Sequence, residues 1–210
     1  MASFLRYIFG GSGKHYRAPT QEEIQEDFFD AIQCEHLDKL KELCARYPDF
    51  NSWRDHQDRS PLHAAQDSNC LQSFIILLDY GAKKNEAYGR GWTPLMTAIN
   101  QQQDFFEDFL LDGEKDINGI ATDAKNNTWG ALHLAVLRKD EGALRELIEN
   151  GADMGLKAKP KGMAAEVTAE EYATQLGDKK LAEMLNLAPE IRTMALQRFA
   201  GPAAPQPPKA

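Results

Sequence analysis

Cysteine is scarce in this chain of 210 residues, and so are clusters of residues that could bind a metal. The three cysteines are odd in number, and no two have the C-x-x-C spacing of redox or zinc sites. Each lies in an apolar, helical context, where a free thiol behaves as a small hydrophobic group. We therefore expect no disulfide framework, no metal site and a reducing compartment. The cysteines are Cys34, Cys44 and Cys70.

Long apolar runs are also missing near the N-terminus. The longest lies in residues 4–9 (FLRYIF), is interrupted by Arg6, and is far shorter than the roughly 20 residues of a membrane-spanning helix. It lacks the length and the cleavage site of a secretory signal. Ala2 stands where N-myristoylation needs a glycine. These features predict a cytoplasmic protein, in its own cell or in a host cell after delivery.

Positive charge is in the minority. The chain has 24 Lys and Arg against 32 Asp and Glu, which gives a formal net charge of −8. An acidic surface repels phosphate groups, so we expect no nucleic-acid partner and favour a protein partner with a basic surface. The hydrophobic share of 42% is normal for a globular protein, so the chain can bury a core.

The N-terminal end differs in composition from the rest of the chain. Residues 1–19 contain no acidic residue and include the run GGSG, so we expect a flexible basic arm. Thr20 followed by Glu23 has the spacing of a capping box, which predicts a helix beginning near Gln21. The basic residues of the arm are Arg6, Lys14 and Arg17.

The C-terminal end is rich in proline and alanine. Residues 200–210 contain four prolines, which are incompatible with a helix or a central strand, so we expect a disordered tail. Before this tail, Pro189 suits the first position of a helix, and apolar residues follow at helical spacing. A short helix is therefore expected over residues 189–199.

Between these ends a six-residue pattern recurs. The segment SPLHAA at residues 60–65 is followed 33 residues later by TPLMTA at residues 93–98. After 37 and then 38 further residues come GALHLA at residues 130–135 and TAEEYA at residues 168–173. Downstream of the first three copies, an apolar segment ends at a glycine suited to a left-handed helix cap. These glycines are Gly81, Gly113 and Gly151.

This pattern resembles the ankyrin motif T-P-L-H-x-A, whose period is about 33 residues. The resemblance covers about residues 21–188 as five units, with the first and last degenerate. It implies an all-α solenoid of stacked helix-turn-helix units with β-turn fingers, placed as a domain over residues 20–188. It also implies hydrogen-bonding roles for His63 and His133 inside and between repeats. The hydroxyl groups expected to cap the first helix of a unit belong to Ser60, Thr93 and Thr168.

Ankyrin proteins usually hold a protein partner on the concave face made by their fingers and inner helices. Tryptophan, tyrosine and arginine often anchor such interfaces, and all three tryptophans fall in the fingers. Packing of each indole against its own finger or the next one is the alternative, whereas the finger arginines and Tyr88 are expected to be exposed. Gln66, Asn100 and Leu137 are also expected on the exposed side of the inner helices. The expected contact residues are Trp53, Arg54, His56, Arg59, Asp67, Tyr88, Arg90, Trp92, Gln101, Asn127, Trp129 and Arg138.

The two longer spacings predict four or five extra residues in two loops. One lies between Asp116 and Trp129, and the other between Asp153 and Thr168. Long loops in a compact fold are often functional, but drift in an exposed loop remains an equal alternative. The second loop has a basic tip, formed by Lys157, Lys159 and Lys161.

The sequence offers no pattern for catalysis, so we expect no enzyme and no cofactor. Residues 10–14 (GGSGK) lack the full phosphate-loop pattern, and no nucleophile elbow occurs. We expect a monomeric protein-interaction module that regulates its partner by covering a site. It would act as an inhibitor of the immunity type or as a host-directed effector. The alternative is a membrane-proximal scaffold anchored by residues 4–9.

Overall fold

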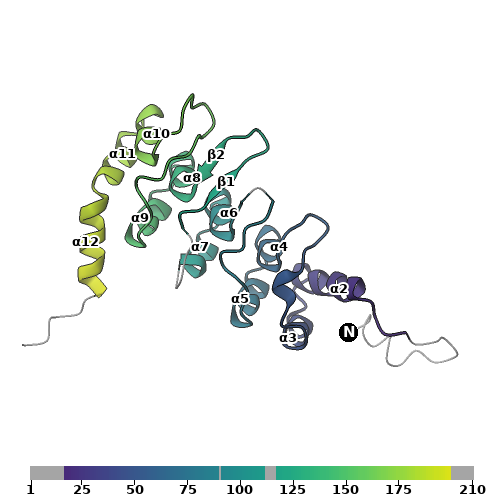
Figure 1. Cartoon of the computed structure of the whole chain (residues 1–210). Helices are drawn as coiled ribbons and strands as arrows, with labels where there is room; N and C mark the ends of the chain where they lie inside the picture. Colours follow the sequence, from purple (N-terminus) through teal and green to yellow (C-terminus); the bar gives the residue numbers. More distant parts are fainter. Residues whose placement is uncertain (1–16, 90, 112–116, 200–210) are drawn as a thin grey trace, which may run out of the picture.

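The computed structural model describes residues 17–89, 91–111 and 117–199. Several expectations lie outside these residues: most of the basic arm with its membrane anchor, the contact at Arg90, the cap at Gly113 and the C-terminal tail. The described chain forms a row of helix pairs (Figure 1). The first helices of the pairs make one layer and the second helices make the other (Figure 1).

Five helix pairs follow one another within the described residues, and this confirms the expected stack of helix-turn-helix units. A short 3-10 helix follows the first pair, a two-stranded antiparallel hairpin precedes the fourth, and one helix follows the fifth. The pairs are α2 (Gln21–Gln33) with α3 (Leu37–Arg46), α4 (Pro61–Asp67) with α5 (Leu71–Asp79), α6 (Pro94–Gln101) with α7 (Asp104–Leu111), α8 (Ala131–Arg138) with α9 (Glu141–Glu149), and α10 (Ala169–Gln175) with α11 (Lys179–Asn186). The other elements are η1 (Phe50–Ser52), β1 (Ile120–Thr122), β2 (Thr128–Gly130) and α12 (Ala188–Phe199).

Most of the inner helices begin at the hydroxyl caps that the sequence predicts. The capping box is confirmed, since Thr20 Oγ1 accepts a hydrogen bond from Glu23 N at 3.3 Å and Glu23 Oε2 accepts one from Thr20 N at 2.8 Å. Such caps satisfy amide groups that have no partner inside the helix. The hydroxyls of Ser60, Thr93 and Thr168 also accept a backbone hydrogen bond at the start of α4, α6 and α10. Of these three, only Thr168 forms a full capping box.

The core runs along the seam between the two layers. Small buried alanines such as Ala64, Ala98 and Ala135 keep the inner helices thin, so neighbouring units stack closely. Outer-helix phenylalanines fill this seam only in part. Phe106 is buried with its ring 4.8 Å from that of Phe74, but Phe105 is 73% exposed. Phe105, and also the exposed Phe109 one turn along α7, therefore do not fill the seam.

At the C-terminal end, α12 lies against α9 (Figure 1). Its Arg192 donates a hydrogen bond from Nε to the carbonyl of Ile148 at 3.1 Å, and its guanidinium also bonds the carbonyl of Ala152. A cation at a helix C-terminus satisfies free carbonyls and favours the helix dipole. No helix in the described ranges combines the length and the apolar character that crossing a bilayer requires.

Each helix pair turns through one residue in the left-handed conformation. The φ angles there are 49°, 54°, 54°, 56° and 76°, in chain order. Only the last of these residues is a glycine, although side chains other than glycine lose roughly 1–2 kcal/mol in this region. The residues are Glu35, Asn69, Gln102, Lys139 and Gly177.

We therefore predict that Gln102→Gly stabilises the protein. Gln102 is exposed and has a φ of 54°, so glycine relieves backbone strain without removing a buried contact. The expected gain in the free energy of unfolding is roughly 0.5–1 kcal/mol, measured by urea denaturation. The matched variant Gln102→Ala keeps the strain and should show no gain. Equal effects of glycine and alanine would show that the strain is not what limits stability.

Candidate functional site

Each of the first three fingers is closed by a backbone hydrogen bond between residues that are four apart in sequence. Asp55 N donates to Arg59 O at 3.2 Å, and Asp123 N donates to Asn127 O at 2.9 Å. In the finger between them, Tyr88 N donates to Trp92 O at 2.9 Å. This shared closure places the side chains that follow each finger at the start of the next inner helix.

In the first finger, an ionised carboxylate organises the turn. Asp55 accepts hydrogen bonds from the backbone amides of Gln57 (2.9 Å) and Arg59 (3.0 Å), and its other oxygen lies 2.6 Å from the Arg59 guanidinium. Partial burial opposes ionisation, but the hydrogen bonds from Arg59 hold the pKa of Asp55 below its ordinary value. The finger is thus fixed with Arg59 directed along α4.

The third finger repeats this design with a different partner. Asp123 accepts hydrogen bonds from Lys125 N (2.8 Å), from Asn127 Nδ2 (2.8 Å) and from Trp129 Nε1 (3.2 Å). Burial again opposes ionisation, but these donors lower the pKa of Asp123 to about 2. Asn127, expected as a contact residue, is therefore held by the finger's own carboxylate.

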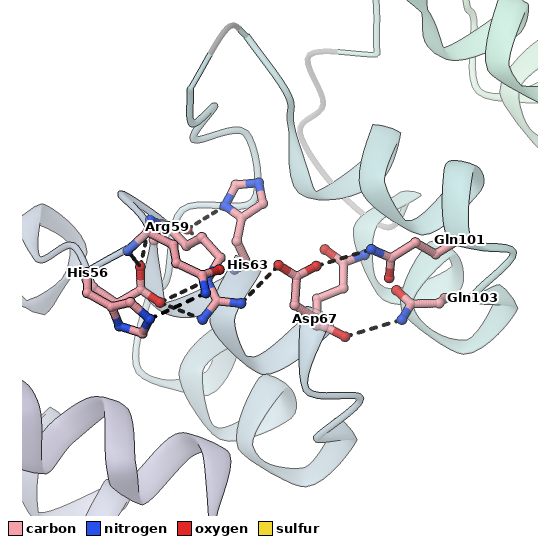
Figure 2. A network of polar contacts seen from close by, with 10 residues as sticks. His56, Arg59, His63, Asp67, Gln101 and Gln103 are labelled. Atoms are coloured by element: carbon pink, nitrogen blue, oxygen red, sulfur yellow. Dashed lines mark hydrogen bonds and ion pairs between the residues drawn. The ribbon is translucent and has the colours of Figure 1, made fainter. Parts of the chain in front are cut away.

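A row of polar side chains crosses the inner helices. The Arg59 guanidinium donates to Asp67 Oδ2 at 3.1 Å, and Gln101 Nε2 donates to Asp67 Oδ1 at 3.1 Å (Figure 2). The next step joins α6 to α8, because Arg138 donates to Asn100 Oδ1 at 2.8 Å. We call this set the polar ladder. It consists of Arg59, Asp67, Asn100, Gln101 and Arg138.

The polar ladder brings together residues from three inner helices and one finger. Four of its members were expected as contact residues from the sequence, and Asn100 was expected to be exposed. Asp67, Gln101 and Arg138 are exposed, but Asn100 is half-buried, contrary to expectation, and the Arg59 side chain is only 11% exposed. The structure therefore corrects the expectation of an exposed Arg59, which is covered by its bonds to Asp55 and Asp67.

Two of the three tryptophans belong to the core. Trp53 is 3% exposed, with its ring centroid 5.0 Å from that of Phe28 in an edge-on arrangement. Trp129 is 5% exposed and lies near Tyr172. For both residues the burial favours packing over partner contact. Trp92 is half-buried.

Two further finger residues were expected to be exposed but are half-buried. The Arg54 guanidinium forms an ion pair with Glu86 of the next finger and bonds the carbonyl of Trp53 at 2.7 Å. The ring of Tyr88 lies 4.2 Å from that of His63. In both cases the neighbouring repeat covers the side chain, so the expectation is wrong. His56 does lie exposed on the first finger.

Gln66 was also expected on the exposed side of its helix, and this expectation is wrong. It is fully buried, and its Nε2 donates to the carbonyl of Pro94 at 3.0 Å. Gln103 Nε2 returns a bond to the carbonyl of Gln66 at 3.2 Å (Figure 2). These bonds fasten α4 to the repeat that follows.

The two motif histidines have the structural roles that the resemblance implies. His63 Nδ1 lies 2.7 Å from Ser60 Oγ within its own repeat, and His133 Nε2 lies 2.9 Å from the carbonyl of Val167 in the next one (Figure 2 shows His63). Burial lowers the pKa of His63 to about 4, although the nearby Asp67 opposes this shift. Burial also lowers the pKa of His133. Neutral rings of this kind serve packing rather than acid–base chemistry at neutral pH.

The last two fingers are bonded to each other. Thr128 N donates to the carbonyl of Lys159 at 2.9 Å, and Lys159 N donates to Thr128 Oγ1 at 2.6 Å. The final finger is closed between Ala158 and Val167, with its basic tip between these positions and just before them. The added residues therefore lengthen the fingers themselves.

Sequence reasoning gave no sign of one group of carboxylates. Oxygens of Asp104, Glu107 and Asp140 lie within 4.8 Å of one another where α7 and α9 begin. Asp140 Oδ1 already accepts a hydrogen bond from Ala143 N at 3.0 Å, as the cap of α9. Acidic groups gather in this way in many proteins without a metal, so we assign no ion to this group.

Comparison with protein-family models connects this geometry to a known repeat. Residues 82–158 match ankyrin repeats, in 3 copies. The matched range runs from the second finger to the beginning of the last one, and it includes α6, α7, α8 and α9.

Proposed function

Because residues 82–158 of this chain are ankyrin repeats, we propose that the chain binds one partner protein across its polar ladder and fingers. Ankyrin repeats indicate a protein–protein interaction module, typically without enzymatic activity. The finer proposal is the surface: the exposed edge of α4, α6 and α8, with the fingers that precede these helices.

The hydrogen bonding of the polar ladder is the observation that supports this surface. Its exposed members are already ordered by bonds that join successive repeats, at 3.1 Å for Gln101 with Asp67 and 2.8 Å for Arg138 with Asn100. Ordering a long side chain on binding costs about 0.5–1.5 kcal/mol, and a side chain fixed beforehand avoids most of that cost. Exposed Leu137 beside Arg138 adds apolar area to the same surface.

The charge of the chain supports a partner with a basic surface. A net charge of −8 attracts such a protein and speeds its association at low salt. Binding across the inner helices would cover an extended part of the partner, which suits inhibition. An immunity-type inhibitor and a host-directed effector differ only in the origin of that partner, in the cytoplasm of the same cell or of a host.

The test is comparative affinity capture from the native cell, followed by mass spectrometry. The double variant Gln101→Ala with Arg138→Ala removes two exposed members of the polar ladder and leaves the buried core intact. We expect a specific partner to be captured by the parent protein and lost with this variant. Once that partner is purified, the variant should weaken its binding by at least about tenfold.

The matched control is Gln72→Ala with Arg145→Ala. These residues are of the same types and are exposed, but they lie on the outer helices α5 and α9. The control should capture the partner as the parent does. If the partner is no longer captured by the control but is still captured by the ladder variant, the interface lies on the outer helices and the proposal is wrong.

A further inference from the structure

A cleft of about 360 Å³ separates the outward face of α2 from the first finger. Its lining is both apolar and acidic. Phe29 of α2 is 6% exposed and contributes a ring to the cleft. The carboxylates that line it from α2 belong to Glu22, Glu26 and Asp30.

These three carboxylates form one stripe, because residues four apart on a helix lie on the same face. All three are exposed, and none of them forms an ion pair or a side-chain hydrogen bond with another described residue. The finger side of the cleft does not balance them, since Arg54 is paired with Glu86 and Asp55 with Arg59. The stripe therefore carries negative charge that repels itself and attracts a cation.

The same chain has a segment of the opposite character immediately before the described residues in sequence. Residues 1–16 contain Arg6 and Lys14 and no acidic residue, and they end five residues before α2 begins. Their run FLRYIF supplies aromatic and aliphatic groups that match an apolar ring such as Phe29. Residues 1–16 are therefore complementary to the cleft both in charge and in apolar character.

The side chain of Arg17 reaches the first turn of α2. The Arg17 guanidinium lies 2.6 Å from Glu23 Oε1. Glu23, Glu26 and Asp30 are spaced three and four apart on the helix, so they share a face. From Glu23 to Asp30 the helix rises about 10 Å, at 1.5 Å per residue. The three residues from Arg17 back to Lys14 also span up to about 10 Å.

From this geometry we infer that residues 1–16 dock in the cleft between α2 and the first finger, with Lys14 opposite Glu26 and Asp30. The segment runs antiparallel to α2, and its apolar residues lie against the Phe29 side of the cleft. The cleft is then an intramolecular binding site for a basic, aromatic peptide, and its occupant is the chain's own N-terminal segment. This inference needs no partner protein, so it stands or fails separately from the function proposed above.

Cys34 offers a site for a probe at this cleft. It is exposed at the C-terminal end of α2, whereas Cys44 and Cys70 are buried. Burial raises the pKa of the Cys44 thiol to about 12, and it also raises that of Cys70, so both react slowly. A nitroxide on Cys34 of the full chain should therefore broaden the amide NMR signals of residues 4–14 at low ionic strength.

Charge reversal on α2 is the decisive variant. Glu26→Lys with Asp30→Lys should abolish the broadening, and adding Lys14→Glu and Arg6→Glu should restore it. The matched control, Asp38→Lys with Glu42→Lys, makes the same change on exposed residues of α3 and should leave the broadening intact. Circular dichroism confirms that each variant is folded.

Three results would overturn the inference. The first is no broadening in the parent chain, and the second is broadening that persists in Glu26→Lys with Asp30→Lys. The third comes from mixing isotopically labelled chains without nitroxide and unlabelled chains that carry it. Broadening in that mixture would assign the cleft to a second copy of the protein.

Discussion

Replacing Trp53 by alanine is expected to lower the free energy of unfolding by roughly 3–5 kcal/mol. The indole is 3% exposed and lies between Phe28, at 5.0 Å between ring centroids, and Tyr47, at 5.6 Å. Phe28 in turn stacks on Phe50 at 5.6 Å, so one aromatic cluster joins α2 to the 3-10 helix. Removing the indole leaves a cavity in this aromatic cluster. Urea denaturation followed by circular dichroism measures the loss.

Two matched variants separate packing from partner contact at this position. Trp53→Phe keeps an aromatic ring, and the indole Nε1 makes no hydrogen bond within the described part of the chain, so most of the stability should return. His56→Ala changes an exposed residue of the same finger and should alter stability by less than about 0.5 kcal/mol. If Trp53→Ala unfolds with the parent's free energy but fails to bind the partner, the indole acts at the interface.

Local rules were enough to place most helices. The caps at Thr20, Ser60 and Thr93 depend on residues three apart in sequence, so the sequence shows both partners at once. The recurrence of the motif then gave the stack, because each unit needs a neighbour to bury its apolar face. Comparison with ankyrin repeats over residues 82–158 agrees with this.

The candidate site was harder to predict because its contacts join different repeats. Gln66 bonds Pro94 at a separation of 28 residues, and Arg54 bonds Glu86 at 32. The spacing of residues within one helix gives no information about partners that lie in another repeat. Several side chains expected to point outward therefore pack against the next unit, whereas Asp67, Gln101 and Arg138 of the polar ladder remain exposed.

The burial of aromatic residues was equally hard to predict from the sequence. Trp53 and Trp129 have the residue type that anchors interfaces, but the same large ring also fills a core well. Composition alone does not separate these uses. Phe105 and Phe109 are the reverse case: the helical pattern places them in an apolar helix, and the structure leaves them exposed on its outer side.

Acidification should destabilise the protein through its two buried motif histidines. His63 has a folded pKa of about 4 against an ordinary value of 6.5, and the pKa of His133 is lowered as well. Between these two pH values the unfolded chain binds a proton that folded His63 does not, so the free energy of unfolding falls as pH falls. The decline begins near pH 6.5 and levels off near pH 4. For His63 alone it amounts to roughly 3 kcal/mol, at about 1.4 kcal/mol per pH unit.

Urea denaturation at a series of pH values from about 7 to about 4.5 tests this decline. His63→Gln removes the titrating ring, so the variant should be less stable at neutral pH, where the bond to Ser60 Oγ is lost, but should depend less on pH. His56→Gln, in an exposed side chain, is the matched control and should keep the slope of the parent. A parent protein whose stability is constant across this range would show that His63 takes up its proton while folded. Because the charge of Asp67 in the polar ladder favours that proton, such a result would point to an interaction between them.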